Sequence, residues 1–260
     1  MGSDLASTPL YDRIGKGYQR FRRADPRIAA MVQSALGDAT SVVNVGAGTG
    51  SYEPTHCRVI AVEPSLTMIN QRPPNAAPAV QGTANDLPFR DNAFDAALAI
   101  LTLHHWPDWR RGIREMARVA RDRVVLLTCD LSAPPFWLME YFPEIAQIDR
   151  PLFPTMAALA SELGSLSVVT VPIFHDCADG FLGAYWRRPW AYLDPDVRQA
   201  ISSFTKLGDI EAQLSRLLAD LESGLWNRRH RDLLLRDSVD LGYRLVIAAA
   251  TSVSASSRNG

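Results

Sequence analysis

The feature that most constrains the fold is a short β-branched run that ends in a cluster of glycines. Residues 41–45 read Ser-Val-Val-Asn-Val, and residues 46–50 continue as Gly-Ala-Gly-Thr-Gly. Glycine tolerates positive φ angles and has no side chain, so such a loop lets a ligand approach the backbone closely. In open α/β sheets, ligands bind at the carboxyl ends of the strands. The pattern therefore predicts a ligand site at the end of this first strand.

Strands and helices alternate through the rest of the chain. Further strands are predicted over residues 58–62, 79–81, 94–100, 123–128, 167–173 and 243–249. Apolar residues at helical spacing predict helices within residues 10–36, 65–70, 108–120, 137–148, 155–163 and most of 180–241. Strands alternating with helices favour a mostly parallel sheet covered on both faces. We therefore expect an α/β, Rossmann-like fold with seven strands and a helical insertion before the last one.

Composition excludes several classes of protein. The 260 residues are 47% hydrophobic and 21% charged, which is typical of a globular protein with a sizeable core. A formal net charge of -1 makes nucleic acid an unexpected partner. Three cysteines without a CxxC pair predict neither a disulfide framework nor a zinc knuckle. No signal peptide and no apolar run of about 18 residues is visible, so we expect a cytoplasmic protein without membrane contact.

The strand over residues 58–62 leads into Glu63, whose carboxylate can accept both hydroxyls of a ribose. The glycine spacing is GxGxG, with Ser51 where the last glycine of a dinucleotide-binding GxGxxG motif would fall. The next strand follows within a few residues, so a long helix aimed at a pyrophosphate is missing. A nicotinamide-dependent oxidoreductase is therefore the less favoured interpretation.

Four segments, taken in order, resemble the class I S-adenosylmethionine (SAM) dependent methyltransferases, in particular the type 11 small-molecule group. They are residues 11–18, 43–50, 61–65 and 82–95, and the similarity continues through residues 103–106 and 114–119. The resemblance covers about half of the chain. It implies SAM as cofactor, S-adenosylhomocysteine as product, and in-line transfer of a methyl group to a small-molecule acceptor.

The resemblance also implies contacts for individual residues. At the cofactor these are Tyr11 and Tyr18 on a helix over it, Gly46, Ala47, Gly48 and Gly50 beneath its methionine part, Glu63 and Pro64 at its ribose, Thr83, Ala84 and Asp86 at its adenine, and Ile100 and Leu101 beside the sulfonium. Two positions depart from the family pattern. Asn44 stands where an aspartate is usual, and Thr83 often corresponds to an acidic residue. One carboxylate near the cationic cofactor is therefore missing.

The acceptor side has fewer signals. His104 and His105 follow the fourth strand and are candidate general bases, although the same stretch could serve as a structural turn. Tyr185, Trp186 and Arg187 would suit an aromatic or anionic acceptor, or they could pack within a cap. No metal is expected, because neighbouring residues in the run from His175 to Asp179 point to opposite faces of a strand.

The predicted organisation has four parts. Residues 1–36 form a helical segment over the cofactor, 37–179 the SAM-binding α/β core, 180–241 a helical substrate cap, and 242–260 the last strand with a polar tail. Two further interpretations stay open. The chain could bind SAM without turnover, or it could methylate tRNA or a protein.

Overall fold

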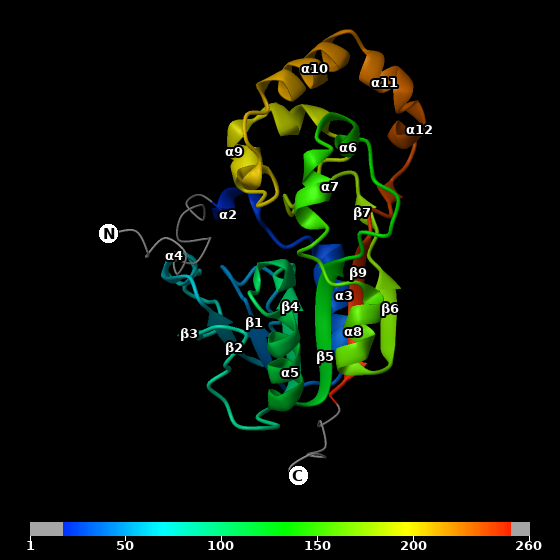
Figure 1. Ribbon diagram of the computed structural model, residues 1–260. Helices are drawn as coiled ribbons and strands as arrows, with labels where there is room; N and C mark the ends of the chain where they lie inside the picture. The colour runs from blue at the N-terminus through cyan, green and yellow to red at the C-terminus, as the bar shows by residue number, and fades with distance from the viewer. Residues whose placement is uncertain (1–17, 251–260) are drawn as a thin grey trace, which may run out of the picture.

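A computed structural model describes residues 18–250. Its centre is a seven-stranded sheet in the order β3-β2-β1-β4-β5-β9-β6. The strands are β1 (Ser41–Val45), β2 (Arg58–Glu63), β3 (Ala79–Gln81), β4 (Phe94–Ile100), β5 (Ala120–Cys129), β6 (Leu166–Thr170) and β9 (Tyr243–Ala249). Only β9 runs antiparallel to its neighbours, β5 and β6. The predicted Rossmann-like α/β fold is therefore confirmed (Figure 1).

Four helices pack along this sheet, and each begins where its sequence predicts. They are α3 (Pro26–Leu36), α4 (Leu66–Asn70), α5 (Trp109–Val119) and α8 (Met156–Leu163). Each is preceded by a side chain that accepts a backbone N–H of the first turn, from Asp25, Ser65, Asp108 and Thr155 respectively. Such N-caps satisfy donors that the helix itself leaves unpaired.

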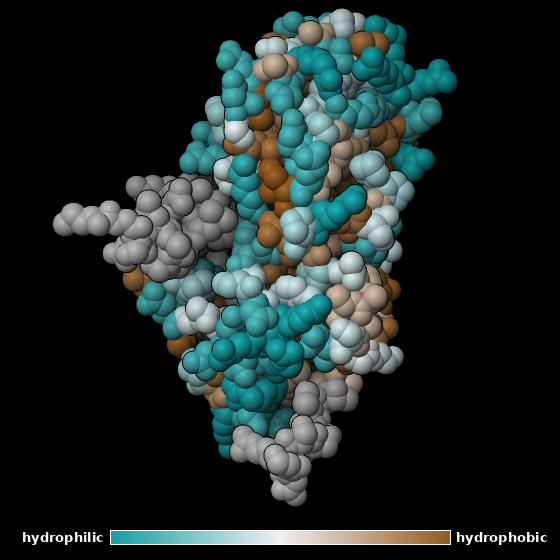
Figure 2. Space-filling view, viewed as in Figure 1, coloured by the Kyte–Doolittle hydropathy of each residue, from teal (hydrophilic) through white to brown (hydrophobic). Residues whose placement is uncertain are grey.

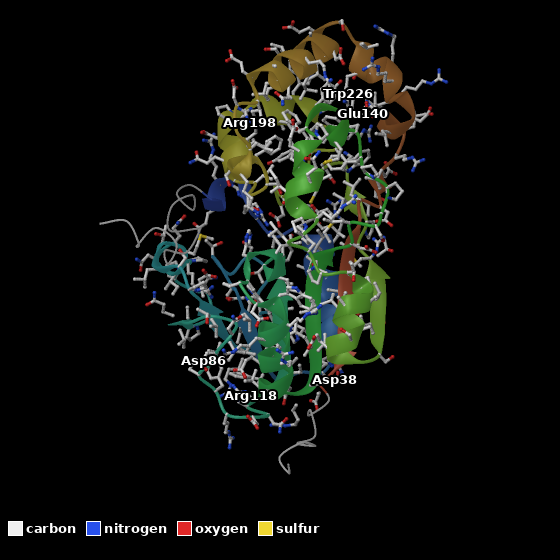
Figure 3. The ribbon with its side chains drawn as sticks, viewed as in Figure 1. Asp38, Asp86, Arg118, Glu140, Arg198 and Trp226 are labelled. Carbon is white, nitrogen blue, oxygen red and sulfur yellow. The ribbon has the colours of Figure 1, made fainter. Side chains whose placement is uncertain are left out.

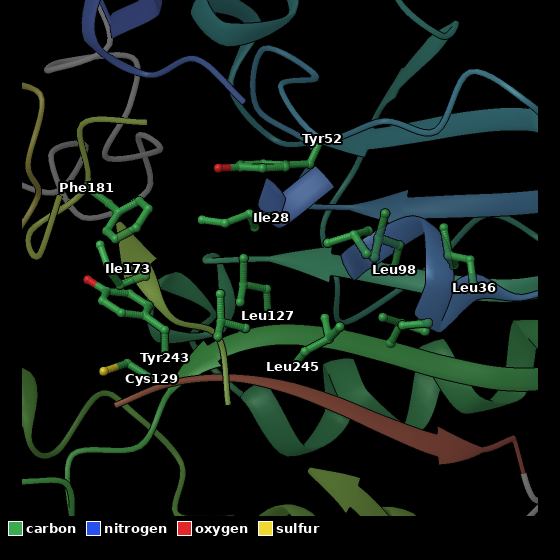
Figure 4. Packing of buried hydrophobic residues seen from close by; sticks show 14 of the residues in the cluster. Ile28, Leu36, Tyr52, Leu98, Leu127, Cys129, Ile173, Phe181, Tyr243 and Leu245 are labelled. Carbon is green, nitrogen blue, oxygen red and sulfur yellow. The ribbon is translucent and has the colours of Figure 1, made fainter. Parts of the chain in front are cut away.

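Two apolar cores lie on opposite faces of the sheet, because successive strand residues point to opposite sides. Val125 and Leu127 of β5 pack with α3 on one face (Figure 4). Val124 and Leu126 pack with α5 and α8 on the other face. The sheet is therefore buried on both sides, as its near-continuous apolar strands predict.

Above the carboxyl ends of the strands lies a layer of short helices, which we call the cap (Figure 1). It contains α6 (Leu138–Tyr141), α7 (Glu144–Asp149), η2 (Pro189–Leu193), α9 (Pro195–Gln199), η3 (Phe204–Lys206), α10 (Glu211–Glu222), α11 (Leu225–Arg229) and α12 (Arg231–Leu234). One apolar cluster joins α6 and α7 to the later helices. Residues 137–145 therefore pack with the cap, although the sequence placed them in the core. The predicted domain boundaries themselves stay a prediction.

Two details differ from the sequence expectation. The strand expected over residues 167–173 stops at Thr170, and a separate strand β7 (Ile173–Phe174) follows Pro172. Proline has no N–H to donate, so it interrupts the ladder. Strand β7 pairs with β8 (Ser238–Val239), which lies inside the stretch expected to be helical.

No helix within residues 18–250 is long and apolar enough to cross a membrane.

The cap also carries apolar atoms on its surface. Figure 2 shows hydrophobic atoms exposed between ridges of hydrophilic atoms in the upper part of this face. Beneath that surface the cap is held by aromatic rings. The ring centre of Trp137 lies 5.1 Å from that of Trp226 and 5.6 Å from that of Tyr192, both in edge contacts. Edge-to-face pairs of this kind add to the stabilisation that apolar burial already gives.

Candidate functional site

The glycine loop (residues 46–50) joins the carboxyl ends of three neighbouring strands. Gly46, Gly48 and Gly50 all have positive φ angles, of 68°, 53° and 86°. The N–H of Gly46 donates to the carbonyl of Val62 at the end of β2, at 2.8 Å. A Cβ added at Gly46 would lie 2.2 Å from Oγ1 of Thr102, just beyond β4. Only glycine fits this position, and the loop is therefore fixed against the ends of β2 and β4.

Glu63 completes this site from the end of β2. Its Oε2 accepts the N–H of Gly48 at 2.8 Å, and its Oε1 accepts the N–H of Ser65 at 3.0 Å. The residue is only 5% exposed. A carboxylate is a strong hydrogen-bond acceptor, and these backbone bonds fix the orientation of Glu63 at the end of β2. An acceptor held in this way fits the hydroxyl donors of a ribose, and hence the nucleoside part of SAM.

A buried ion pair supports the loop from below. Arg72 donates to Glu53 at 2.6 Å and to the carbonyl of Gly48 at 3.1 Å. The two charged side chains are 5% and 8% exposed. The amide of Asn44 donates to Oε1 of Glu53 at 3.3 Å. An aspartate at position 44 would place a like charge beside Glu53, so the departure from the family pattern has a local electrostatic reason.

The predicted adenine side contains one orphaned polar atom. Oδ1 of Asn85 is buried and has no hydrogen-bond partner among residues 18–250. Its neighbour Ala84 is buried, whereas Thr83 and Asp86 are exposed. In Figure 3, Asp86 lies beside the sheet on the loop between β3 and β4, well below the cap. A buried acceptor without a donor is costly, so Asn85 is a better candidate for meeting an adenine amine than Asp86.

The end of β4 is strained next to the predicted sulfonium side. Leu101 has a φ of 49°, an unusual value for a residue with a side chain. Ile100 and Leu101 are both partly exposed, and their neighbour Thr102 accepts the indole N–H of Trp106 at 3.2 Å. Backbone strain held by its surroundings is frequent at ligand sites. Pro64 follows Glu63 and is partly exposed, and its contact with the cofactor stays a prediction.

His104 and His105 lie on η1 (Leu103–His105), directly after this turn. The ring of His104 stacks on Phe153 with centres 4.3 Å apart and lies 3.8 Å from the ring of His105. Burial, together with the positive charges of Lys206 and Arg22, lowers the pKa of His105 to about 3. Burial and His105 likewise lower the pKa of His104. Both rings are therefore neutral at physiological pH and are weak proton acceptors, which argues against the general-base hypothesis.

The structure brings only some of the predicted acceptor residues to the end of the sheet beneath the cap. Tyr185 is partly buried and packs against both the cap cluster and one core of the sheet. Trp186 is 1% exposed, and its indole N–H donates to the carbonyl of Ile173 at 3.0 Å. Arg187 instead reaches the carbonyl of Arg236 at 3.1 Å on the surface. The assignment of Trp186 and Arg187 to the acceptor stays a prediction, and the burial of Trp186 and the bond of Arg187 to Arg236 speak against it.

A further charged residue, Arg22, comes from the N-terminal part of the described chain. Tyr11 lies outside the described residues, and Tyr18 is the first residue of α2 (Tyr18–Phe21). Just after α2, Nε of Arg22 lies 2.5 Å from Oδ1 of Asp179, and both side chains are nearly buried. The hydroxyl of Tyr52 donates to the other oxygen of Asp179 at 2.9 Å. The spacing of these residues in the sequence carries no signal for this network.

Side chains in the run from His175 to Asp179 form hydrogen bonds within the protein. Asp176 accepts from Arg27 at 2.8 Å, and the thiol of Cys177 donates to the carbonyl of Asp179 at 3.6 Å. Between residues 18 and 250, no three His, Cys, Asp or Glu side chains gather as metal ligands would. This run therefore serves the packing of the loop after β7.

Together these features form a candidate nucleoside site at the carboxyl ends of the strands of an α/β protein. A family model for a methyltransferase domain matches residues 43–128. Demethylmenaquinone methyltransferase of Corynebacterium kroppenstedtii is 32% identical over 160 residues, which cover 56% of this chain and 66% of that protein. The 2-methyl-6-phytyl-1,4-hydroquinone methyltransferase 2 of Oryza sativa is 34% identical over 116 residues, covering 40% and 33%.

A solved structure extends the match over most of the chain. It belongs to a protein of Anabaena variabilis described as a candidate methyltransferase from an antibiotic biosynthesis pathway. The TM-score is 0.81 at 31% identity, covering 88% of this chain and 98% of the other. The chain therefore belongs to the class I SAM-dependent methyltransferases of the type 11 group. SAM is the cofactor of this family. The sequence matches themselves span only 33% to 66% of the curated relatives.

Proposed function

We propose that the protein is an enzyme that transfers a methyl group from SAM to a small-molecule acceptor by in-line displacement. The observation that carries this proposal is Glu63, a buried carboxylate that two backbone N–H groups orient beside the glycine loop. The names of the two curated relatives specify demethylmenaquinone and a phytyl hydroquinone, both small molecules. These names support a small acceptor here.

The chain's own residues need to do little chemistry in such a reaction. When bound, SAM supplies a methyl group that its sulfonium already activates. The glycine loop and Glu63 hold the cofactor, and the cap covers the acceptor side and excludes water. The neutral His104 and His105 offer hydrogen bonds there, not a strong base. An acceptor that arrives with an ionised or easily ionised oxygen fits this surface best.

Calorimetric titration of SAM into native protein and Glu63→Gln tests the cofactor site. Loss of one charged acceptor is worth about 1.5–3 kcal/mol, so we expect roughly 10- to 100-fold weaker binding by the variant. Glu222→Gln, an exposed change on α10, should bind like the native protein. Absence of binding heat with native protein, at concentrations that saturate methyltransferases, would contradict the proposal.

Turnover separates an enzyme from a protein that only holds SAM. We expect S-adenosylhomocysteine to form in the presence of SAM and a panel of small aromatic and anionic acceptors. The same assay with bulk tRNA and with denatured protein distinguishes the acceptor classes. Product that forms only with a macromolecule would overturn the small-molecule assignment, and SAM binding without product from any acceptor would favour a binding protein.

A further inference from the structure

Residues 18–22, which comprise α2 and Arg22 and which we call the strap, contact the chain on both sides of the glycine loop. In Figure 1, α2 lies between α4 beside the sheet and α9 of the cap. The side-chain amide of Gln19 donates to the carbonyl of Gln71, just after α4. The hydroxyl of Ser51, directly after the glycine loop, donates to the carbonyl of Arg22 at 3.3 Å. The strap therefore runs beside the carboxyl ends of β1 and β2, where the cofactor is expected.

The loop that leads from β7 into the cap holds the strap through its backbone. Arg22 and Asp179 form an isolated antiparallel bridge, and the N–H of Gly180 donates to the carbonyl of Phe21 at 2.8 Å. A Cβ added at Gly180 would lie 2.7 Å from that carbonyl oxygen and 2.5 Å from the hydroxyl of Tyr185. No side chain fits there, so the two backbones are in direct contact.

The carboxylate of Asp179 joins the strap to the end of the glycine loop. The residue is 1% exposed. Its Oδ1 lies 2.5 Å from Nε of Arg22, and its Oδ2 accepts the hydroxyl of Tyr52 at 2.9 Å. Burial raises the pKa of Tyr52, so its hydroxyl keeps its proton and can donate. In Figure 4, this hydroxyl points toward the side on which Phe181 lies, two residues after Asp179. One buried carboxylate therefore binds two separate parts of the chain.

The energetics of this network favour a role in geometry. Packed apolar side chains of similar volume would often stabilise a fold as much as a buried ion pair, because both charges must leave water. The bonds of Asp179 form only when the strap, the residue after the glycine loop and the loop after β7 lie in this arrangement. Separation of the strap would leave a buried charge without its counter-ion, which is costly. The network therefore favours one position of the strap over others.

We propose that Asp179 is a positioning residue for the cofactor, which keeps the strap closed beside the glycine loop until Arg22 and Tyr52 separate from it. The inference rests on the methyltransferase function proposed above and adds a residue to its cofactor site. Asp179 acts through Arg22 and Tyr52 and needs no contact with SAM. Segments that close over a ligand slow its release, so opening of the strap should limit the dissociation of S-adenosylhomocysteine.

The dissociation rate of S-adenosylhomocysteine tests this role. Surface plasmon resonance on immobilised protein measures association and dissociation separately. Asp179→Asn should release the ligand at least about tenfold faster and change its association less than about threefold. Asp176→Asn is the matched control, since it breaks the pair of a 60% exposed carboxylate with Arg27 in the same loop, and it should behave like the native protein. Native release by folded Asp179→Asn would overturn the proposal.

Two further variants keep the test independent of folding. The double variant Arg22→Gln/Asp179→Asn removes both charges, so no buried charge is left without its counter-ion. Arg22→Gln should therefore change the dissociation rate less in the Asp179→Asn background than in the native protein, because the two side chains share one link. Tyr52→Phe removes a single hydroxyl and should speed release about threefold or more. Fully additive effects of Arg22→Gln and Asp179→Asn would contradict the proposal.

Hydrogen exchange gives a readout that a purely structural role would not change. S-adenosylhomocysteine should slow amide exchange of residues 18–22 in the native protein and in Asp176→Asn, but not in Asp179→Asn. If Asp179→Asn lost stability to urea yet kept native release and native protection of the strap, Asp179 would be structural only and the proposal would fail. If the native protein fails to bind S-adenosylhomocysteine, the methyltransferase function fails. If it binds and Asp179→Asn releases it normally, only the positioning role fails.

Discussion

The glycine loop and the cap are held in place by different kinds of interaction. At the cofactor end, the loop after β1 is set by backbone geometry and by the buried pair of Glu53 and Arg72. At the proposed acceptor end, the cap consists mostly of short helices that meet through aromatic rings such as Trp137 and Trp226. Helices of four to six residues are not stable alone, so packing decides where their side chains point. The glycine loop is therefore held by its own backbone geometry and a buried ion pair, whereas the cap side chains depend on packing against their neighbours.

The largest effect should come from breaking the ion pair beneath the loop. Glu53→Gln keeps the shape of the side chain but leaves the buried charge of Arg72 without its counter-ion. Removal of one member of a buried pair costs about 3–5 kcal/mol of unfolding free energy. Because Arg72 also holds the carbonyl of Gly48, SAM binding should weaken as well. Urea unfolding and calorimetry measure the two losses.

Asp232→Asn provides the matched control for that experiment. It breaks the ion pair with Arg231, whose side chains are 82% and 84% exposed. Exposed pairs contribute about 0–1 kcal/mol, so little stability should be lost. If Glu53→Gln were as mild as this surface change, the loop would not depend on the buried pair.

A loss of similar size should follow when the loop backbone itself is perturbed. Gly46→Ala adds a Cβ at a φ of 68°, only 2.2 Å from Oγ1 of Thr102. Gly164→Ala adds one at a φ of 77° after α8, with no atom within 4 Å. Strain alone costs about 1–3 kcal/mol, and the clash should add about 1–3 kcal/mol at Gly46. Equal unfolding free energies for the two variants would show that contact with Thr102 is unimportant.

The same contrast explains what the sequence could predict. Local sequence determines the strands from β1 to β5 and the glycine loop, because apolar runs, N-caps and glycines act within a few residues. The position of Glu63 at the end of β2 was predictable for that reason. In the cap, Trp186 and Arg187 are neighbours in a run that the sequence assigned to the acceptor, yet one is core and the other surface. Only tertiary packing separates them.

Other misses have the same origin. Arg22 meets Asp179 across 157 positions, and no local pattern announces such a pair. Strand β8 forms because β7 is available to pair with it, although its surroundings read as helical.

The smallest predicted effect measures how far the cap depends on specific bonds as well as on ring packing. Trp137 donates its indole N–H to the carbonyl of Trp186 at 2.7 Å, whereas the indole N–H of Trp226 is buried with no acceptor in the described part of the chain. Both side chains are nearly inaccessible, at 3% and 0% exposure. Replacement by phenylalanine removes similar volume at both positions.

Trp137→Phe leaves a buried carbonyl unpaired, whereas Trp226→Phe removes an N–H that was already unpaired. The first variant should therefore lose about 1–3 kcal/mol more unfolding free energy than the second, measured by urea denaturation. S-adenosylhomocysteine binding should be retained by both, since neither ring lies at the cofactor end. Equal losses would mean that the cap is held by ring packing alone. Loss of cofactor binding in either variant would show that the two ends of the site are coupled through the cap.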